Sequence, residues 1–254
     1  MSEAQEIFEV YPAPEPLLLR EIALFLDLDG TLAPIAPRPQ DVAPEADLTA
    51  RLERLEQALG GRLAVISGRT LADVDRILEG RVAAVAAVHG LIRRGTDRVV
   101  IQTPPHPALQ DAAERLRIFA QSDAGLMVEE KDGRSVALHF RLARDKGPEA
   151  LRLCRQIAQE TGLVLQRGDM VEELRTPGPT KGDSLRDFMA DPAFAGVTPV
   201  FVGDDRTDED GFTAAAELGG FGVLVGPPRA TAARFGLTDV AATAQWLEAS
   251  LWGA

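Results

Sequence analysis

Two aspartates follow a short apolar run near the start of the chain. Asp27 and Asp29 come directly after residues 22–26 and are separated by one position. With this spacing, one carboxylate can attack a phosphorus atom while the other protonates the leaving oxygen and later activates water. Gly30 permits a tight turn that would expose both carboxylates, and Thr31 can donate a hydrogen bond to a phosphate oxygen. These residues indicate phosphoryl transfer, although a polar strand end followed by a turn would also account for them.

An acidic segment later in the chain offers ligands for a cation. Five acidic residues fall within the seven positions 204–210, after another apolar run. So many like charges would repel one another without a cation, and two or three carboxylates plus a phosphate oxygen suit Mg²⁺. Such an ion would draw Asp27 and a phosphate together. The alternative is an acidic helix start, which explains Asp208 and Glu209 better than it explains Asp204.

Two further segments could contact the same phosphate. Ser67 and Gly68 follow a second apolar run, where a hydroxyl and a free N–H could bind phosphate oxygens, although a plain turn into a helix would look the same. Lys181 follows a turn rich in proline and glycine, where its charge could lie between Asp27 and the phosphate rather than in solvent. The four segments share one context, the end of a strand or the start of a helix, and this favours a common site.

The elements that position these residues alternate between short apolar runs and amphipathic helices. After an irregular lead-in over 1–20, strands are expected at 22–26, 63–66, 82–88, 199–202 and 222–225, and helices at 48–59, 70–78, 181–189 and around Trp246 and Leu247. Strands that alternate with helices are typical of right-handed βαβ units and a parallel sheet. Ligands bind such sheets at the carboxyl ends of the strands, where the four segments lie.

The middle of the chain has a different pattern. It predicts helices at 108–121 and 147–161 and strands at 126–130, 134–141, 163–166 and 170–175, with a hairpin turn at Asp132-Gly133. This order is typical of a small α+β domain inserted into the α/β one. We therefore expect an α/β core at 1–104 and 180–254 and an inserted domain at 105–179. Segments near 104–107 and 176–180 would act as hinges when the insert closes.

The overall composition excludes several classes of protein. The 254 residues carry a formal net charge of −12, and no basic run is longer than Arg93-Arg94, so nucleic acid is not an expected partner. No apolar run approaches the length of a membrane span. The acidic N-terminus does not resemble a secretory signal, and the single cysteine, Cys154, cannot form an internal disulfide. We expect a cytoplasmic protein with a small-molecule partner.

With these segments, the chain resembles the haloacid dehalogenase superfamily of phosphotransferases. The four motifs of that superfamily match residues 27–31, Ser67, Lys181 and residues 203–205. The resemblance implies a Rossmann-like core, a cap domain inserted after the third strand, Mg²⁺ and an aspartyl-phosphate intermediate. His106 matches no motif and is expected on the surface of a proline-rich link.

Within that superfamily, the chain resembles the trehalose-6-phosphate phosphatases from about residue 23 to 250. The similar segments are 26–32, 66–69, 88–90, 130–131, 137–141, 173–175 with 181–182, and 203–209, the last being the most specific. The chain departs from the family at Ile92, where an acid is usual, and at Thr176, where a proline is frequent.

The resemblance implies a role for each matching residue. Asp27 would be the nucleophile and Asp29 the general acid and base, with Lys181 assisting the transfer. Mg²⁺ would be held by Asp27, the Asp29 carbonyl and Asp204, with Asp205 and Asp208 close by. Phosphate would contact Thr31, Ser67, Gly68 and Lys181. The sugar and cap contacts would be Arg69, His89, Glu130, Lys131, His139, Arg141 and Glu173. Without the resemblance, the solvated face of a strand would account equally for His139 and Arg141.

The function implied by the resemblance is Mg²⁺-dependent hydrolysis of trehalose 6-phosphate by a monomer, the last step of trehalose synthesis. Three alternatives remain open. The substrate could be another sugar phosphate, such as sucrose phosphate or a glycosyl phosphoglycerate. A mutase would share the first steps and pass the phosphoryl group to another hydroxyl. A non-catalytic sensor would be expected to have lost Asp27, Asp29 or the acidic segment, and all three are present.

Overall fold

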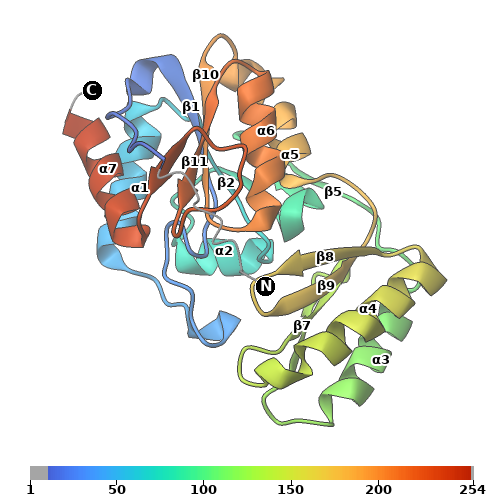
Figure 1. Ribbon diagram of the computed structural model, residues 1–254. Helices are drawn as coiled ribbons and strands as arrows, with labels where there is room; N and C mark the ends of the chain where they lie inside the picture. The colour runs from blue at the N-terminus through green and yellow to red at the C-terminus, as the bar shows by residue number, and fades with distance from the viewer. Residues whose placement is uncertain (1–10, 253–254) are drawn as a thin grey trace.

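The computed structural model describes residues 11–252, and Figure 1 shows two sheets, each with its own helices. Of the irregular lead-in predicted over 1–20, residues 1–10 lie outside the described residues, as does most of the N-terminus that was compared with a secretory signal. Residues 11–18 contain no helix or strand and lead into a short 3-10 helix, Leu19–Glu21. Between 11 and 252, no helix is both long and apolar enough to cross a membrane.

The larger sheet has eight strands in the order β12-β11-β10-β1-β2-β3-β4-β5. The first six of these are parallel; at one edge β4 runs antiparallel to β3, and β5 runs antiparallel to β4. The strands are β1 (Ile22–Leu26), β2 (Leu63–Ile66), β3 (Ala84–Ala87), β4 (Ile92–Arg94), β5 (Val100–Gln102), β10 (Thr198–Gly203), β11 (Phe221–Val225) and β12 (Phe235–Leu237). The predicted α/β class with a parallel sheet is confirmed.

Helices cover both faces of the larger sheet, which explains the continuous apolar runs of its central strands. On one face, Leu24 and Leu26 of β1 pack with residues of α1 (Ala46–Ala58), α2 (Leu71–Ile77) and α7 (Val240–Trp252). On the other, Ala23 and Phe25 pack with α5 (Lys181–Met189) and α6 (Glu209–Glu217). A strand with helices on both sides has no face left for polar residues, so its polar side chains come after its last residue.

The smaller sheet has four antiparallel strands in the order β6-β7-β9-β8. They are β6 (Met127–Lys131), β7 (Ser135–His139), β8 (Val164–Gly168) and β9 (Val171–Arg175). Helices α3 (Leu109–Ala120) and α4 (Gly147–Thr161) pack on one face, against Val136, Leu138 and Leu174. Because strand side chains alternate, the neighbours of these three residues point to the opposite face, which is not covered by α3 or α4.

Candidate active site

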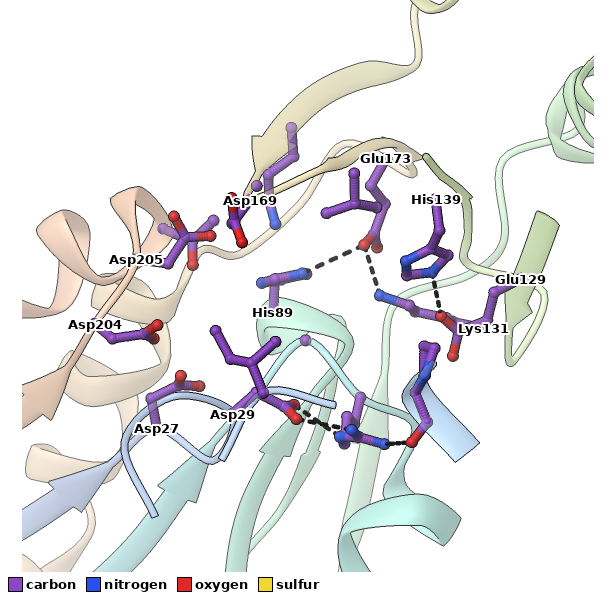
Figure 2. A pocket seen from close by; sticks show the side chains of 18 of the residues that line it. Asp27, Asp29, His89, Glu129, Lys131, His139, Asp169, Glu173, Asp204 and Asp205 are labelled. Atoms are coloured by element: carbon purple, nitrogen blue, oxygen red, sulfur yellow. Dashed lines mark hydrogen bonds and ion pairs between the residues drawn. The ribbon is translucent and has the colours of Figure 1, made fainter. Parts of the chain in front are cut away.

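A cavity lies between the carboxyl edge of the larger sheet and the open face of the smaller one (Figure 2). The larger sheet and its loops contribute Asp27, Asp29, Ile35, Ala36, Pro37, Pro39, Gly68, Arg69, His89, Lys181, Asp204, Asp205 and Thr207. The smaller sheet and its loops contribute Glu129, Lys131, His139, Arg141, Gln166, Gly168, Asp169, Val171 and Glu173. Residues from nearly every motif singled out in the sequence therefore meet in one place.

The predicted nucleophile Asp27 follows β1 and is tied to a buried lysine. The Nζ atom of Lys181 donates to Asp27 Oδ1 at 2.8 Å and to Asp208 Oδ1 at 2.6 Å. Lys181 is the first residue of α5, whose start is fixed by a capping box between Thr180 and Asp183. The local sequence thus determines where the lysine leaves the backbone, and the fold brings it to the end of β1.

Burial and neighbouring charges determine the ionisation of Asp27 and Lys181. Burial raises the pKa of Asp27 well above its ordinary range against the charge of Lys181, and Asp208 and Asp204 add to the rise. Burial alone would lower the pKa of Lys181, but Asp208 and Asp27 raise it above its ordinary value. Lys181 is therefore a cation that lies between two carboxylates.

Asp208 organises the acidic segment from within. Its Oδ2 atom accepts the N–H groups of Asp204 at 3.0 Å and Asp205 at 2.9 Å, while Oδ1 accepts from Lys181. Both oxygens of this fully buried carboxylate are thus engaged. Arg229 supports the same loop from outside, because its Nη2 atom donates to the carbonyls of Asp204 and Asp205.

Asp204 lies against the turn that follows β1. Gly30 has a φ of +78°, and a Cβ atom at this position would lie 2.1 Å from Asp204 Oδ2. Burial, together with Asp208, raises the pKa of Asp204 to about 7. Only glycine lets the turn approach the carboxylate so closely, which explains why the predicted pair of motifs can share a site.

The carboxylates present fit a divalent cation. Single oxygen atoms of Asp27, Asp204 and Asp208 all lie within 4.8 Å of one another. An all-oxygen set suits a hard cation, and burial, with smaller contributions from neighbouring carboxylates, raises the pKa values of Asp27 and Asp204. Since the oxygens of Asp208 already accept hydrogen bonds, Asp27 and Asp204 are the better candidates for direct ligands. Asp205 lines the cavity, and its Oδ1 atom accepts the N–H of Arg206 at 2.7 Å.

Asp29, the predicted acid and base, forms a two-pronged ion pair with Arg69. The Nε and Nη2 atoms of Arg69 donate to the two oxygens of Asp29, both at 2.7 Å. The remaining nitrogen, Nη1, donates to the carbonyl of Pro39 at 2.8 Å. Figure 2 shows the Asp29 carboxylate directed away from Asp27. Arg69 lines the cavity as expected, but its partner there is an aspartate of the first motif.

Of the four predicted phosphate contacts, the structure brings Gly68 and Lys181 to the cavity wall. Ser67 is buried, and its hydroxyl accepts the N–H of Arg69 at 3.2 Å. Thr31 is fully buried, and within residues 11–252 its hydroxyl has no hydrogen-bond partner. Neither residue lines the cavity.

His89 reaches the cavity through an unusual backbone conformation. Val88 and His89 have φ values of +47° and +57°, and Gly90 follows at +106°. Such a conformation costs of order 1–3 kcal/mol for each non-glycine residue. It ends the predicted strand 82–88 at Ala87 and turns the imidazole over Gly68, where a Cβ would lie 2.4 Å from it.

On the smaller sheet, the register lets acids and bases pair across the cavity wall. Glu129 and Glu173 flank the small Ala137 in adjacent strands. Lys131 Nζ donates to Glu173 Oε2 at 2.7 Å, and His139 Nε2 lies 2.8 Å from Glu129 Oε2 (Figure 2). The face therefore presents both donors and acceptors.

Glu173 also contacts the larger sheet's side of the cavity. His89 Nε2 lies 3.5 Å from Glu173 Oε2, and burial lowers the pKa of His89 although Glu173 opposes the shift. Burial would raise the pKa of Glu173, but the charges of Lys131 and His89 bring it well below its ordinary range. Glu173 is thus a buried carboxylate that joins the two walls.

The structure does not bring Glu130 into the cavity. Its side chain points to the helix-covered face of β6, is 51% exposed and pairs with Arg117 of α3. Glu129 occupies the cavity side instead, a residue that the sequence analysis missed. The signal was available, because the alternation of a strand places residue 129 on the same face as Lys131.

Two other expectations concern the edges of the site. Arg141 lines the cavity and pairs with Asp169, its Nη1 atom lying 2.9 Å from Asp169 Oδ2. Ile92, the position of the missing family acid, is 3% exposed and packs in the core of the larger sheet. An acid is therefore not missing from the cavity wall at that position.

Comparison with known proteins gives a consistent result. A family model described as trehalose-phosphatase matches residues 25–240. A probable trehalose-phosphate phosphatase of Sinorhizobium fredii is 37% identical over 208 residues, which cover 81% of this chain and 78% of that one. The trehalose-6-phosphate phosphatase of Escherichia coli is 36% identical over 235 residues, which cover 92% and 88%. The C-terminal domain of C. albicans trehalose-6-phosphate phosphatase superposes with a TM-score of 0.85 at 19% identity, covering 95% of this chain and 98% of that one, and supports the fold.

Proposed function

The chain belongs to the trehalose-phosphatase family, and we propose that it hydrolyses trehalose 6-phosphate to trehalose and phosphate, the last step of trehalose synthesis. The observation that carries the proposal is a single cavity with two different walls. One wall has Asp27 bonded to Lys181 beside the acidic segment, which suits phosphoryl transfer. The other wall has side chains of the smaller sheet that donate and accept hydrogen bonds, which suit the hydroxyl groups of a sugar.

In the proposed reaction, Asp27 attacks phosphorus and Asp29 protonates the sugar oxygen that leaves. Asp29 then takes a proton from the water that attacks the aspartyl-phosphate. Lys181 balances the negative charge of the buried nucleophile and of the incoming phosphate, as its 2.8 Å contact with Asp27 supports. Gly68 offers the phosphate close access to a backbone N–H. Mg²⁺, held by Asp27, Asp204 and the Asp29 carbonyl, would supply further positive charge at the phosphate.

We propose that residues 105–179 act as a cap over a core of residues 1–104 and 180–254. The two links between them lie side by side, because the N–H of His106 donates to Thr176 Oγ1 at 3.1 Å. The cap would bind the sugar through Glu129, Lys131, His139 and Glu173, with Arg141 at the rim. Closure around links that lie together would exclude water from the phosphate. We also propose a cytoplasmic monomer, and its buried, unpaired Cys154 agrees with a reducing compartment.

The test is a panel of phosphate esters assayed with Mg²⁺ for release of inorganic phosphate. We expect trehalose 6-phosphate to give a kcat/KM well above sucrose phosphate, glucosyl phosphoglycerate and simple hexose phosphates. Comparable rates on several sugars would defeat the specific claim, and an isomeric sugar phosphate as product would indicate a mutase. Asp27→Asn should abolish turnover while the circular dichroism spectrum is retained. A protein that binds the sugar phosphate with no turnover at all would instead be a sensor.

The cap assignment has a matched test in two neighbouring glutamates. Glu129→Gln should raise the KM for trehalose 6-phosphate about tenfold, because it removes a charged acceptor from the cavity wall. Glu130→Gln alters the same charge on the opposite face, where Arg117 is the partner, and should leave KM within about twofold. If both variants raise KM equally, sugar recognition does not take place on this face of the sheet.

A further inference from the structure

Arg69 has no nitrogen left without a partner. Nε and Nη2 donate to Asp29, and Nη1 donates to the carbonyl of Pro39. The side chain is only 8% exposed, whereas that of Asp29 is 34% exposed. Both residues line the cavity, and the carboxylate is the more exposed member of the pair, while the arginine is held by all three of its nitrogens.

The two-pronged geometry of the ion pair restricts the orientation of the Asp29 carboxylate. A guanidinium fork matches a carboxylate at both oxygens and restricts its rotation, unlike a single hydrogen bond. Without such a partner, Asp29 could rotate freely within a cavity that also holds Asp27 and Asp204. The fork keeps its two oxygens apart from that cluster, directed away from Asp27 (Figure 2).

Resting on the proposed phosphatase function, we propose that Arg69 is the positioning residue of the general acid and base Asp29, and not a sugar contact. The Pro39 carbonyl fixes the guanidinium, the guanidinium fixes the carboxyl group, and the carboxyl group faces the oxygen that leaves. Arg69, which follows the second motif, would therefore act through Asp29 of the first motif, 40 positions earlier in the chain.

The ion pair has a place in each half of the reaction. In the first half, an Asp27 oxygen bonds to phosphorus, the bond from phosphorus to the sugar oxygen breaks, and the Asp29 proton moves to that oxygen. While Asp29 carries its proton, one of the two hydrogen bonds from Arg69 must be broken. The other hydrogen bond keeps the carboxyl group in position. In the second half, a water oxygen bonds to phosphorus, the bond to Asp27 breaks, and Asp29 takes the water proton. Between the two halves, Asp29 is a carboxylate and accepts both bonds.

The experiment compares two substrates that contain no sugar. 4-Nitrophenyl phosphate has a good leaving group that needs no proton, while phenyl phosphate has a poorer one that does. In the Mg²⁺-loaded protein, Arg69→Gln should lower kcat/KM for phenyl phosphate by roughly 10²-fold and for 4-nitrophenyl phosphate by less than about threefold. Asp29→Asn should show the same imbalance. The double variant should fall no further on phenyl phosphate, because both changes remove one function.

The chain offers a matched control in Arg94. Its side chain is 7% exposed, its Nη1 and Nη2 atoms donate to the two oxygens of Asp75 at 2.6 and 2.8 Å, and its Nε atom donates to the carbonyl of Ala83. It does not line the cavity. Arg94→Gln should therefore cost similar stability and leave the ratio of the two rates unchanged. Arg69→Lys, which retains the charge without the fork, should fall between native protein and Arg69→Gln.

The outcomes separate the possible roles of Arg69. Equal losses on both substrates, or an altered ratio in Arg94→Gln, would overturn the proposal in favour of a purely structural arginine. An unchanged ratio with a raised KM for trehalose 6-phosphate would also overturn it and make Arg69 a sugar contact. If Arg69→Gln fails to fold, the ratio of kcat/KM for the two aryl phosphates in Arg69→Lys decides between the roles. Failure of trehalose 6-phosphate as a substrate would refute the proposed function and leave this comparison intact, since aryl phosphates report on the leaving group alone.

Discussion

Replacing Lys131 with methionine would leave a carboxylate buried without its main counter-charge. Lys131 Nζ lies 2.7 Å from Glu173 Oε2, and the two side chains are 9% and 4% exposed. Removing one partner of such a pair lowers the free energy of unfolding by about 3–5 kcal/mol. Each kcal/mol changes the Tm of a chain of this size by roughly 2–4 °C, so the Tm at neutral pH should fall by roughly 6–20 °C.

The size of this loss should depend on pH. In the native protein, burial opposes ionisation of Glu173, but Lys131 and His89 hold its pKa well below the ordinary range. A depressed pKa contributes stability above the unfolded value of about 4.3 and loses it as the pH falls through the folded value. In the variant, burial would raise the same pKa, so the variant binds a proton on folding and is stabilised as the pH falls. Lys131 itself has a raised pKa and keeps its charge throughout this range. The difference between the two proteins should be largest at neutral pH and shrink toward about pH 4.

Guanidinium chloride unfolding at several pH values measures both effects, with the second partner as control. The double variant Lys131→Met with Glu173→Gln removes the buried charge altogether and should recover most of the lost stability. A single variant that is equally destabilised at all pH values would refute the reasoning. So would a double variant no more stable than the single one, because the loss would then come from packing of the lysine stem.

Three further predictions concern the acidic segment. Gly30→Ala should lower the free energy of unfolding by about 1–3 kcal/mol and weaken Mg²⁺ binding. The new Cβ would lie 2.1 Å from Asp204 Oδ2, and the φ of +78° is unfavourable for alanine. Denaturation with and without Mg²⁺ separates the two losses. Arg229→Gln removes the donor that lies 2.8 Å from the Asp205 carbonyl, so the Kd for Mg²⁺ should rise about three- to tenfold in calorimetry without substrate; an unchanged Kd would mean that the loop is held by Asp208 alone. Since burial and Asp208 raise the pKa of Asp204 to about 7, protons compete with the cation below that pH. Mg²⁺ affinity should therefore rise by up to about tenfold per pH unit toward neutrality and then level off, and a flat profile from pH 5.5 to 8 would exclude Asp204 as a ligand.

The central part of the fold could be predicted from the sequence because burial on both faces leaves a clear signal. β1 and β10 are continuous apolar runs, and the residues that follow each run lie at the cavity. The edge strands β4, β5 and β12 have only three residues each and were not expected. β5 contains the β-branched residues Val100 and Ile101, which favour a strand, but both are exposed, so burial does not mark it as the central strands are marked.

The site could be predicted only as far as residue type indicates position. Asp27, Lys181 and Asp204 meet as expected, because each comes directly after a strand or at a helix start. The choice between Glu129 and Glu130 could have been made from the alternation of β6 (Met127–Lys131), which places residue 129, and not 130, on the face of Lys131. The partner of Arg69 could not be predicted, because an ion pair across 40 positions depends on how two turns pack. His89 needed two residues with positive φ, which no residue preference suggests.

The contact between His106 and Thr176 has a consequence for engineering. The N–H of one and the hydroxyl of the other are 3.1 Å apart, so the chain leaves the larger sheet and returns to it at nearly the same point. A segment whose two ends meet can be exchanged for another of different length without displacing the rest of the chain. The stretch between these residues is therefore an interchangeable cassette, and grafting the corresponding segment of another sugar phosphatase should transfer substrate preference while Asp27, Lys181 and Asp204 stay in place.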